Sequence, residues 1–287
     1  MAYLYHIFSN GTKADILFPQ QEEKVYAINT LAIYSSICSV KVYVFVINET
    51  HFHLIVYGEE PDVENYVLHI KVRLSRYLIS EKNNPLALGT GLQITKDKIS
   101  DRDEGLRKFI YVYRNCLDCY SGAPWNYPWS VGNIFFNPEG SLGEGKRIGD
   151  LSLNQQRALF HIRQALPSEW RYNQDGLILP SSFIDIAAVE SLFGSIRAFL
   201  AFMFVRKEDE QAMKQRIYHR QIEMRSIESL RTFASEYANK LFKKGLRICS
   251  SYEKLQIARM MIKDRVAIKS ASLMRALYLK NEDVDFL

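Results

Sequence analysis

The sequence predicts an α+β fold in its first half, with helices packed on an antiparallel sheet, and an all-helical second half. Three observations lead to this prediction. Runs rich in β-formers alternate with runs of helical period over the first 120 residues, the period is almost wholly helical after residue 150, and a polar, glycine-rich stretch separates the two parts. With 287 residues, 47% of them hydrophobic, the chain can bury one sizeable core and a second, smaller one.

The first half predicts the order strand, helix, hairpin, helix, strand, helix. The expected strands are rich in β-branched and aromatic side chains and span residues 2–9, 40–47, 51–57 and 91–96. The expected helices carry apolar residues at helical spacing and span residues 20–39, 61–82 and 103–122. This order approximates the split β-α-β arrangement of ferredoxin-like folds, in which the strand that carries the "HFHLIV" run is central.

The domain boundary is expected in the stretch "NPEGSLGEGKRIGD", whose glycines and charges are typical of a linker. A first domain then covers residues 1–137, a linker 138–150 and a helical domain 151–287. The end of the chain predicts helices over 252–263 and 270–278, a turn and the beginning of a third helix. Two short helices joined by a turn indicate a helix-turn-helix-like segment.

Composition indicates a cytoplasmic protein that does not enter a membrane. No apolar run approaches the roughly 18 residues of a membrane span, and the start of the chain lacks a signal-peptide pattern. Four cysteines are too few for a disulfide framework in a chain of this length. From Arg206 onward, 18 Lys and Arg stand against 11 Asp and Glu, whereas residues 1–205 carry 19 against 21. A basic last third suits a polyanion such as nucleic acid, and solubility alone explains a surplus of this size equally well.

The stretch "NETHFHLIV" places His51 and His53 one residue apart, so their side chains share one face of a strand. Alone, such a pair is more often part of a half-exposed sheet face than a metal site. Tyr111 and Asn115 are four residues apart in an expected helix, which places a phenol and an amide on one helical face. Two imidazoles and an amide oxygen are able to hold a divalent ion that polarises a phosphodiester, and a neighbouring phenolate is able to attack the phosphorus.

These residues resemble the single-tyrosine HUH transposases, and within them the REP-associated tyrosine transposases. The matching pieces are the His-hydrophobic-His strand "HFHLIV", the helix with Tyr-x-x-x-Asn, here "YVYRN", and the aromatic Pro-Trp-Ser element, here "NYPWS". The start "YHIFSNGTKADILF" and the run "LSRYL" also match. The resemblance covers roughly residues 3–135, with the motifs in order.

The resemblance implies roles for matching positions. His51, His53 and Asn115 would bind Mg²⁺ or Mn²⁺, and Tyr111 would be the nucleophile that forms a 5′-phosphotyrosine link and frees a 3′-hydroxyl. The implied activity is DNA nicking and strand transfer, as in DNA transposition and recombination. The implied partner is single-stranded or hairpin DNA, and both a monomer and a homodimer are compatible with the family.

Two alternatives remain open at this stage. Tyr113 and Tyr120 compete with Tyr111 for the role of nucleophile. Glu49-Thr50 stands where the family usually has Pro-Asn, and Cys116 stands where it has Pro, so a DNA-binding regulator that kept the fold and lost the reaction is the second hypothesis. Basic residues offered as DNA contacts are Arg73, Arg76, Lys243, Lys244, Arg247, Lys269 and Arg275.

Overall fold

The protein is described by a computed structural model over residues 1–9, 16–81, 92–142, 145–203, 225–264, 266–267 and 270–280. By its internal contacts the chain divides into two compact units, residues 1–210 and 211–287. This division differs from the expected one, which placed the linker at 138–150. Residues 145–203 belong to the first unit.

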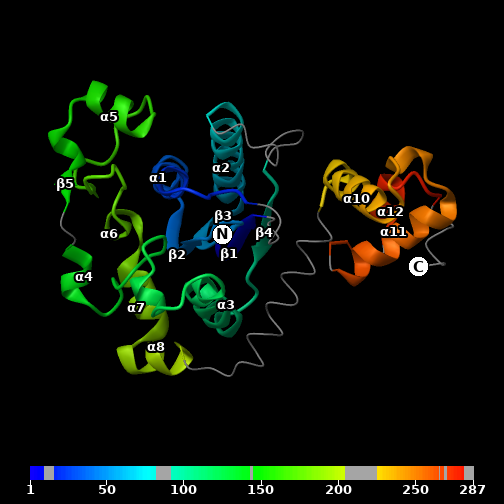
Figure 1. Cartoon of the computed structure of the whole chain (residues 1–287). Coiled ribbons are helices and arrows are strands. Elements are labelled where there is room, and N and C mark those ends of the chain that lie inside the picture. The colour runs from blue at the N-terminus through cyan, green and yellow to red at the C-terminus, as the bar shows by residue number, and fades with distance from the viewer. Residues whose placement is uncertain are drawn as a thin grey trace. The chain divides into compact units, whose positions relative to one another are not determined.

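The first unit is built on a four-stranded antiparallel sheet (Figure 1). The strands are β1 (Ala2–Ser9), β2 (Lys41–Ile47), β3 (Phe52–Glu59) and β4 (Ile94–Lys98), in the spatial order β2-β3-β1-β4. β1 and β2 are both antiparallel to β3 and therefore run parallel to each other, with β3 between them. The mixed helix and sheet architecture agrees with the α+β prediction, and β3 is an inner strand, as expected.

Helices cover both faces of this sheet (Figure 1). On one face lie α1 (Gln21–Ile37) and α2 (Glu60–Ser80), and on the other lies α3 (Arg102–Arg114). Asp101 is the N-cap of α3, and its side chain accepts the backbone N–H of Glu104. The helix expected over 103–122 is shorter than predicted, because α3 passes into a 3₁₀ turn, η2 (Asn115–Asp118).

Residues 138–142 and 145–203 form short elements around the outer edge of β2. They are α4 (Pro138–Leu142), β5 (Lys146–Arg147), η4 (Ile148–Asp150), α5 (Leu153–Phe160), β6 (Arg171–Tyr172), α6 (Pro180–Phe183), α7 (Ile186–Phe193) and α8 (Ile196–Met203). Isolated bridges join Val46 to Ser130 and Val42 to Ile184. These bridges satisfy backbone groups along an edge strand that is otherwise a template for pairing with another chain.

Buried polar contacts explain why this region belongs to the first unit. The Asn29 side chain on α1 donates to the backbone oxygen of Gly176 and accepts from the backbone N–H of Ile178, each at 2.8 Å. The Arg73 guanidinium on α2 donates to the backbone oxygens of Phe160 and His161. The continuous helical pattern expected here is interrupted, because α5 ends in a left-handed residue at His161 and a tight turn follows before α6.

The second unit contains α10 (Ile227–Phe242), η5 (Leu246–Ile248), α11 (Ser251–Lys263) and α12 (Ala271–Ala276). Serine N-caps start each of the three α-helices, and their core is small and aliphatic, with Ala234, Ala238, Ile257, Met261 and Leu273 fully or nearly fully buried. α11 and α12 match the helices expected over 252–263 and 270–278. The expected third helix falls after the turn at 279–281, on residues 282–287, which lie outside the described residues.

Among the described residues, no single helix is both long and apolar enough to cross a bilayer. α7 and α8 pass that test only as a pair, across a bend of 78°.

Candidate functional site

His51 stands at the end of the tight turn between β2 and β3. The backbone N–H of Asn48 donates to the backbone oxygen of His51 at 2.8 Å, which closes the turn. The backbone oxygen of Glu49 in turn accepts the N–H groups of Leu17 and Phe18, also at 2.8 Å. The turn is therefore fixed from both sides, and it places the His51 imidazole at the edge of the sheet face that α3 covers.

His53 lies on β3 opposite Phe8 of β1 and is 1% exposed. Its ring packs edge-on against the ring of Tyr111, with centroids 5.4 Å apart, and lies 4.9 Å from the ring of His51. The two histidines therefore share the α3 face of the sheet, as the alternation of the strand predicts.

Asn115 joins the phenol of Tyr111 to the imidazole of His51. Its side-chain nitrogen donates to the Tyr111 hydroxyl at 3.3 Å, and its side-chain oxygen lies 3.0 Å from Nε2 of His51. The expectation that Tyr111 and Asn115 share a helical face is confirmed by the first of these contacts. Both residues are buried, with 6% and 2% of their surface exposed.

Asn48 is a fifth member of the site that the sequence did not suggest. Its side-chain nitrogen donates to the side-chain oxygen of Asn115 at 2.6 Å, and its own side-chain oxygen accepts the Cys119 thiol at 3.5 Å. Asn48 is 3% exposed. A donor at this position holds the Asn115 amide with its oxygen toward the imidazole and its nitrogen toward the phenol.

Burial keeps the imidazoles neutral. Desolvation lowers the pKa of His51, although the Asn115 hydrogen bond opposes that effect. Desolvation, with smaller contributions from the neighbouring rings, holds the pKa of His53 well below its usual range. A neutral imidazole is the form that binds a metal through a ring lone pair.

The spacing of His51 and Asn115 fits a divalent ion. Two ligand atoms about 2.1 Å from one ion and at right angles lie about 3.0 Å apart, which is the separation of His51 Nε2 and Asn115 Oδ1. The ring nitrogens that would face away from the ion have partners, since His51 Nδ1 lies 2.8 Å from the Thr50 hydroxyl and His53 Nδ1 bonds to His6. Two imidazoles make this donor set softer than the all-oxygen shell of Mg²⁺, which favours Mn²⁺.

The candidate ligand set contains no carboxylate. Over the described ranges, no group of three or more His, Cys, Asp or Glu side chains is placed to hold a metal. An ion at His51, His53 and Asn115 would therefore depend on an amide oxygen as its third protein ligand.

The competing tyrosines point elsewhere. The Tyr113 hydroxyl donates to the backbone oxygen of Gly132 at 3.0 Å, its ring packs among phenylalanines, and desolvation raises its pKa. Tyr120 contacts the backbone oxygen of Asn126 and the ring of Tyr127. Of the three tyrosines, Tyr111 is the one whose hydroxyl meets Asn115.

The "NYPWS" element packs against the end of β2, beside the turn that carries His51. The Tyr127 hydroxyl donates to the backbone oxygen of Ile47 at 2.9 Å, and the Ile47 N–H donates to the backbone oxygen of Trp129 at 2.8 Å. Two of the three motif pieces on which the resemblance rests, the histidine strand and this element, are therefore neighbours in space.

The basic residues offered as DNA contacts have different environments. Arg73 is 9% exposed, and its guanidinium is engaged with backbone oxygens and the Tyr26 ring. Arg76, Lys243 and Arg275 are exposed, Lys244 pairs with Glu253 at 2.8 Å, and Arg247 lies over the Tyr278 ring. Lys269 lies outside the described residues.

Three residues of the site were not expected from the sequence: His6, Asn48 and Thr50. His6 lies on β1, where its ring reaches His53 across the strand pair. The sequence did contain an indication of His6. In the expected strand "YHIF" side chains alternate between the two faces, so the polar ring of His6 lies on the same face as Phe8. Asn48 and Thr50 act through the turn geometry, which the residue pattern does not specify.

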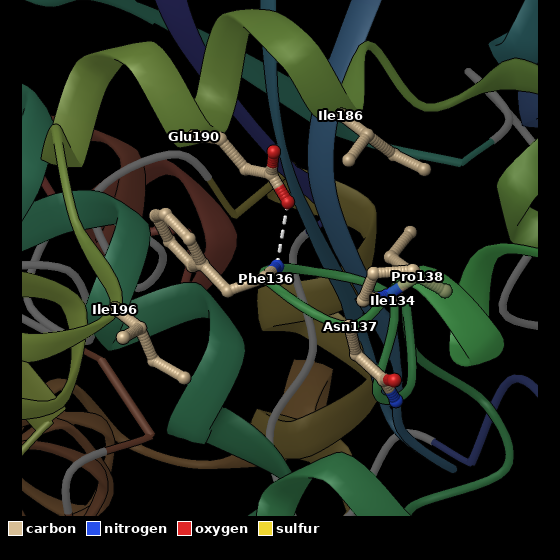
Figure 2. Close-up of a pocket in the computed structure, with 7 residues that line it drawn as sticks. All are labelled: Ile134, Phe136, Asn137, Pro138, Ile186, Glu190 and Ile196. Carbon is tan, nitrogen blue, oxygen red and sulfur yellow. Dashed lines mark hydrogen bonds between the residues drawn. The ribbon is translucent and has the colours of Figure 1, made fainter.

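An apolar hollow of about 410 Å³ lies elsewhere in the first unit (Figure 2). It is lined by Ile134, Phe136, Asn137, Pro138, Ile186, Glu190 and Ile196. The one carboxylate there accepts the backbone N–H of Phe136 at 2.6 Å, as Figure 2 shows. None of the imidazole, phenol or amide groups described above lines this hollow.

No protein-family model matches the chain, and no curated protein matches it. A solved structure described as "Structure of the REP associates tyrosine transposase bound to a REP hairpin" is similar to it at 14% sequence identity. The match covers 45% of this chain and 76% of that chain, with a TM-score of 0.36. At this identity and TM-score, the similarity does not establish a shared activity.

Proposed function

We propose that this chain processes DNA as a tyrosine transposase of the HUH type, through a covalent phosphotyrosine intermediate. The observation that carries the proposal is the chain of contacts from the Tyr111 hydroxyl through the Asn115 amide to Nε2 of His51, at 3.3 and 3.0 Å. These contacts bring a nucleophile next to side chains of the kinds that bind metals, from two segments some 60 residues apart in the sequence. The strand order β2-β3-β1-β4 supports the ferredoxin-like class proposed for this domain.

The residues have complementary roles in this proposal. A divalent ion held by His51, His53 and Asn115, Mn²⁺ or Mg²⁺, would polarise the scissile phosphodiester. Tyr111 forms the new bond from its oxygen to phosphorus and loses its proton, while the bond from phosphorus to the 3′ oxygen breaks and that oxygen gains a proton. The phosphotyrosine bond conserves the energy of the broken linkage, so the strand can be rejoined without a nucleotide cofactor.

Incubation with labelled, hairpin-flanked single-stranded DNA and Mn²⁺ tests the proposal. We expect a covalent protein–DNA adduct from the wild-type chain and none from Tyr111→Phe. Tyr113→Phe is the matched control, because it removes a hydroxyl from the same helix that faces Gly132. An adduct of equal yield from Tyr111→Phe would overturn the assignment of the nucleophile.

A second function is favoured by one observation. His53 and Tyr111 are 1% and 6% exposed, so a phosphodiester reaches them only if α3 moves away from the sheet. A protein that binds DNA without cutting it requires no such movement. This hypothesis predicts hairpin binding that is independent of metal and unchanged in His51→Ala, with no adduct from any variant.

The second unit supports a DNA partner under either function. Its described residues include 11 Lys and Arg against 4 Asp and Glu. Arg231, Arg247 and Lys254 converge on the ring of Tyr278, at 5.0, 5.7 and 5.8 Å from its centroid. The Arg247 hydrogen bond and these charges lower the pKa of Tyr278. We call these four residues the Tyr278 cluster and propose that it contacts phosphates.

A further inference from the structure

His6 is a buried histidine on β1 that the proposed reaction does not use. It is fully buried, and it lies diagonally across the strand pair from His53, since His6 is opposite Ile55 and Phe8 is opposite His53. Nε2 of His6 and Nδ1 of His53 are 3.1 Å apart in a hydrogen bond. The two rings are nearly parallel, with centroids 5.2 Å apart and an angle of 20°.

This bond couples the positions of two ring protons. A neutral imidazole carries one N–H and one lone pair. If His6 donates from Nε2, then His53 accepts at Nδ1 and carries its proton on Nε2. If His53 donates from Nδ1 instead, its Nε2 keeps a lone pair, which is the arrangement that a metal ligand needs.

Packing alone does not account for a histidine at this position. Nδ1 of His6 is buried without a hydrogen-bond partner, and a buried polar atom left in this way is destabilising. The rings around it belong to Phe8, His53 and Tyr111, so an apolar side chain at position 6 would avoid that cost. In the described part of the chain, Nε2 of His53 makes no hydrogen bond, which leaves it available to a ligand.

We propose that His6 is a positioning residue that accepts the Nδ1 proton of His53 and so presents the Nε2 lone pair of His53 to a divalent ion. The inference rests on the proposed function. Thr50 stands in the same relation to His51, 2.8 Å from its Nδ1. Each histidine of the pair thus has its own partner on the nitrogen that faces away from the ion.

Titration of the full chain with Mn²⁺, followed by calorimetry or by loss of the free-ion electron paramagnetic resonance signal, tests the proposal. We expect His6→Leu to weaken Mn²⁺ affinity about 10- to 100-fold. We expect His6→Gln to restore most of the affinity, because its side-chain oxygen reaches about as far as Nε2 and accepts the same proton. His69→Leu is the matched control, since His69 stacks on Tyr34 in the helical layer on the opposite face of the sheet.

A second measurement separates positioning from a loss of structure. Long-range ¹H–¹⁵N correlation spectra report which nitrogen of each imidazole carries the proton. In the absence of Mn²⁺, we expect His53 to shift toward the Nε2–H tautomer in His6→Leu. In His6→Gln it should keep the Nδ1–H tautomer. If His6→Leu does not fold, as judged by its thermal transition, His6→Met replaces it.

The outcomes separate the role of His6 from the proposed function. If the wild-type chain binds Mn²⁺ and His6→Leu binds it equally well, the role of His6 is wrong and the proposed function stands. If the wild-type chain does not bind Mn²⁺, the metal-dependent function fails and the role of His6 fails with it. Equal loss of affinity in His6→Leu and His6→Gln also overturns the proposal, because acceptance of the proton would then not matter.

Discussion

The Thr50 hydroxyl lies 2.8 Å from Nδ1 of His51. A hydroxyl is able to donate or accept. Without an ion, His51 donates from Nε2 to the Asn115 oxygen, and Thr50 donates to Nδ1. With the proposed ion at Nε2, the His51 proton would stand on Nδ1 and Thr50 would accept it. Thr50 would therefore give the His51 imidazole a partner at Nδ1 in both states.

Replacement of Thr50 by valine tests this role. Thr50→Val keeps the shape of the side chain and removes the hydroxyl, so we expect Mn²⁺ affinity to fall about 10- to 100-fold. Thr50→Ser keeps the hydroxyl and should bind Mn²⁺ like the wild-type chain. Calorimetric titration measures both variants, and equal affinities for Val and Ser would show that the Thr50 hydroxyl does not support His51.

Individual residues of the site were predictable to different degrees. The pairing of Tyr111 with Asn115 follows from helical spacing, and the shared face of His51 and His53 follows from strand alternation. His6 and Asn48 were not predictable in the same way. Their contacts depend on which strands pair and in what register, and a single sequence does not specify that register.

At the scale of elements, α3 decides how the site is assembled, because it carries Tyr111 and its C-terminal end positions Asn115, its C-cap. Its first turn is fixed by Glu104, which accepts the backbone N–H and the hydroxyl of Ser100 at 2.8 and 2.7 Å and pairs with Lys108 at 3.0 Å. Burial alone would raise the pKa of Glu104, but these donors outweigh it and lower the pKa to about 2.

Glu104 should therefore make stability depend on pH. Its pKa in the folded state is below the unfolded value of 4.5, so its contribution is complete above about pH 4.5 and is lost as the pH falls toward 2. We expect Glu104→Gln to lower the free energy of unfolding by about 1 kcal/mol at pH 7, with a smaller difference at pH 3. Urea unfolding at the two pH values measures this.

Asp103→Asn is the control for that experiment, because Asp103 is an exposed acid in the same turn. Asp103→Asn should lower the free energy of unfolding at pH 7 by less than Glu104→Gln does. If Glu104→Gln lowered the free energy of unfolding equally at pH 7 and pH 3, that result would contradict the proposed role of the ionised carboxylate.

The length of α3 was the least predictable feature of this element. The pattern from residue 103 to 122 remains compatible with a helix throughout, yet the regular helix ends at Arg114. Beyond Asn115 the chain turns so that Tyr127 and Trp129 reach the end of β2. This tertiary requirement overrides the local helical preference.

At the scale of the whole molecule, the chain combines a sheet unit that contains the candidate site with a basic helical unit. The sequence located the basic charge in the last third and predicted α11 and α12. It did not predict that residues 145–203 belong with the sheet, because the polar pair of Asn29 with Gly176 and Ile178 joins segments almost 150 residues apart. Gly140, which the sequence placed in a linker, lies in α4 of the first unit.

The proposed DNA contact of the Tyr278 cluster predicts a change in salt dependence. Arg247→Gln and Lys254→Gln should each weaken hairpin binding and lower the slope of log affinity against log salt by about 1, because each removes one phosphate contact. Lys240→Gln, an exposed lysine of α10 outside the cluster, should change the slope less. Fluorescence anisotropy between about 50 and 200 mM salt measures the slopes. Equal slopes for all three variants would place the DNA contact elsewhere.

The proposed function makes Tyr111 the nucleophile of a DNA strand-transfer site. Nuclease digestion of the Mn²⁺-dependent adduct followed by peptide mass spectrometry tests it most directly, because the residual nucleotide stays on the residue that attacked. We predict a nucleotide mass on the peptide with Tyr111, with the fragment ions assigning it to that residue. A modification on Tyr113 or Tyr120, or no covalent product with any hairpin substrate, would contradict the claim.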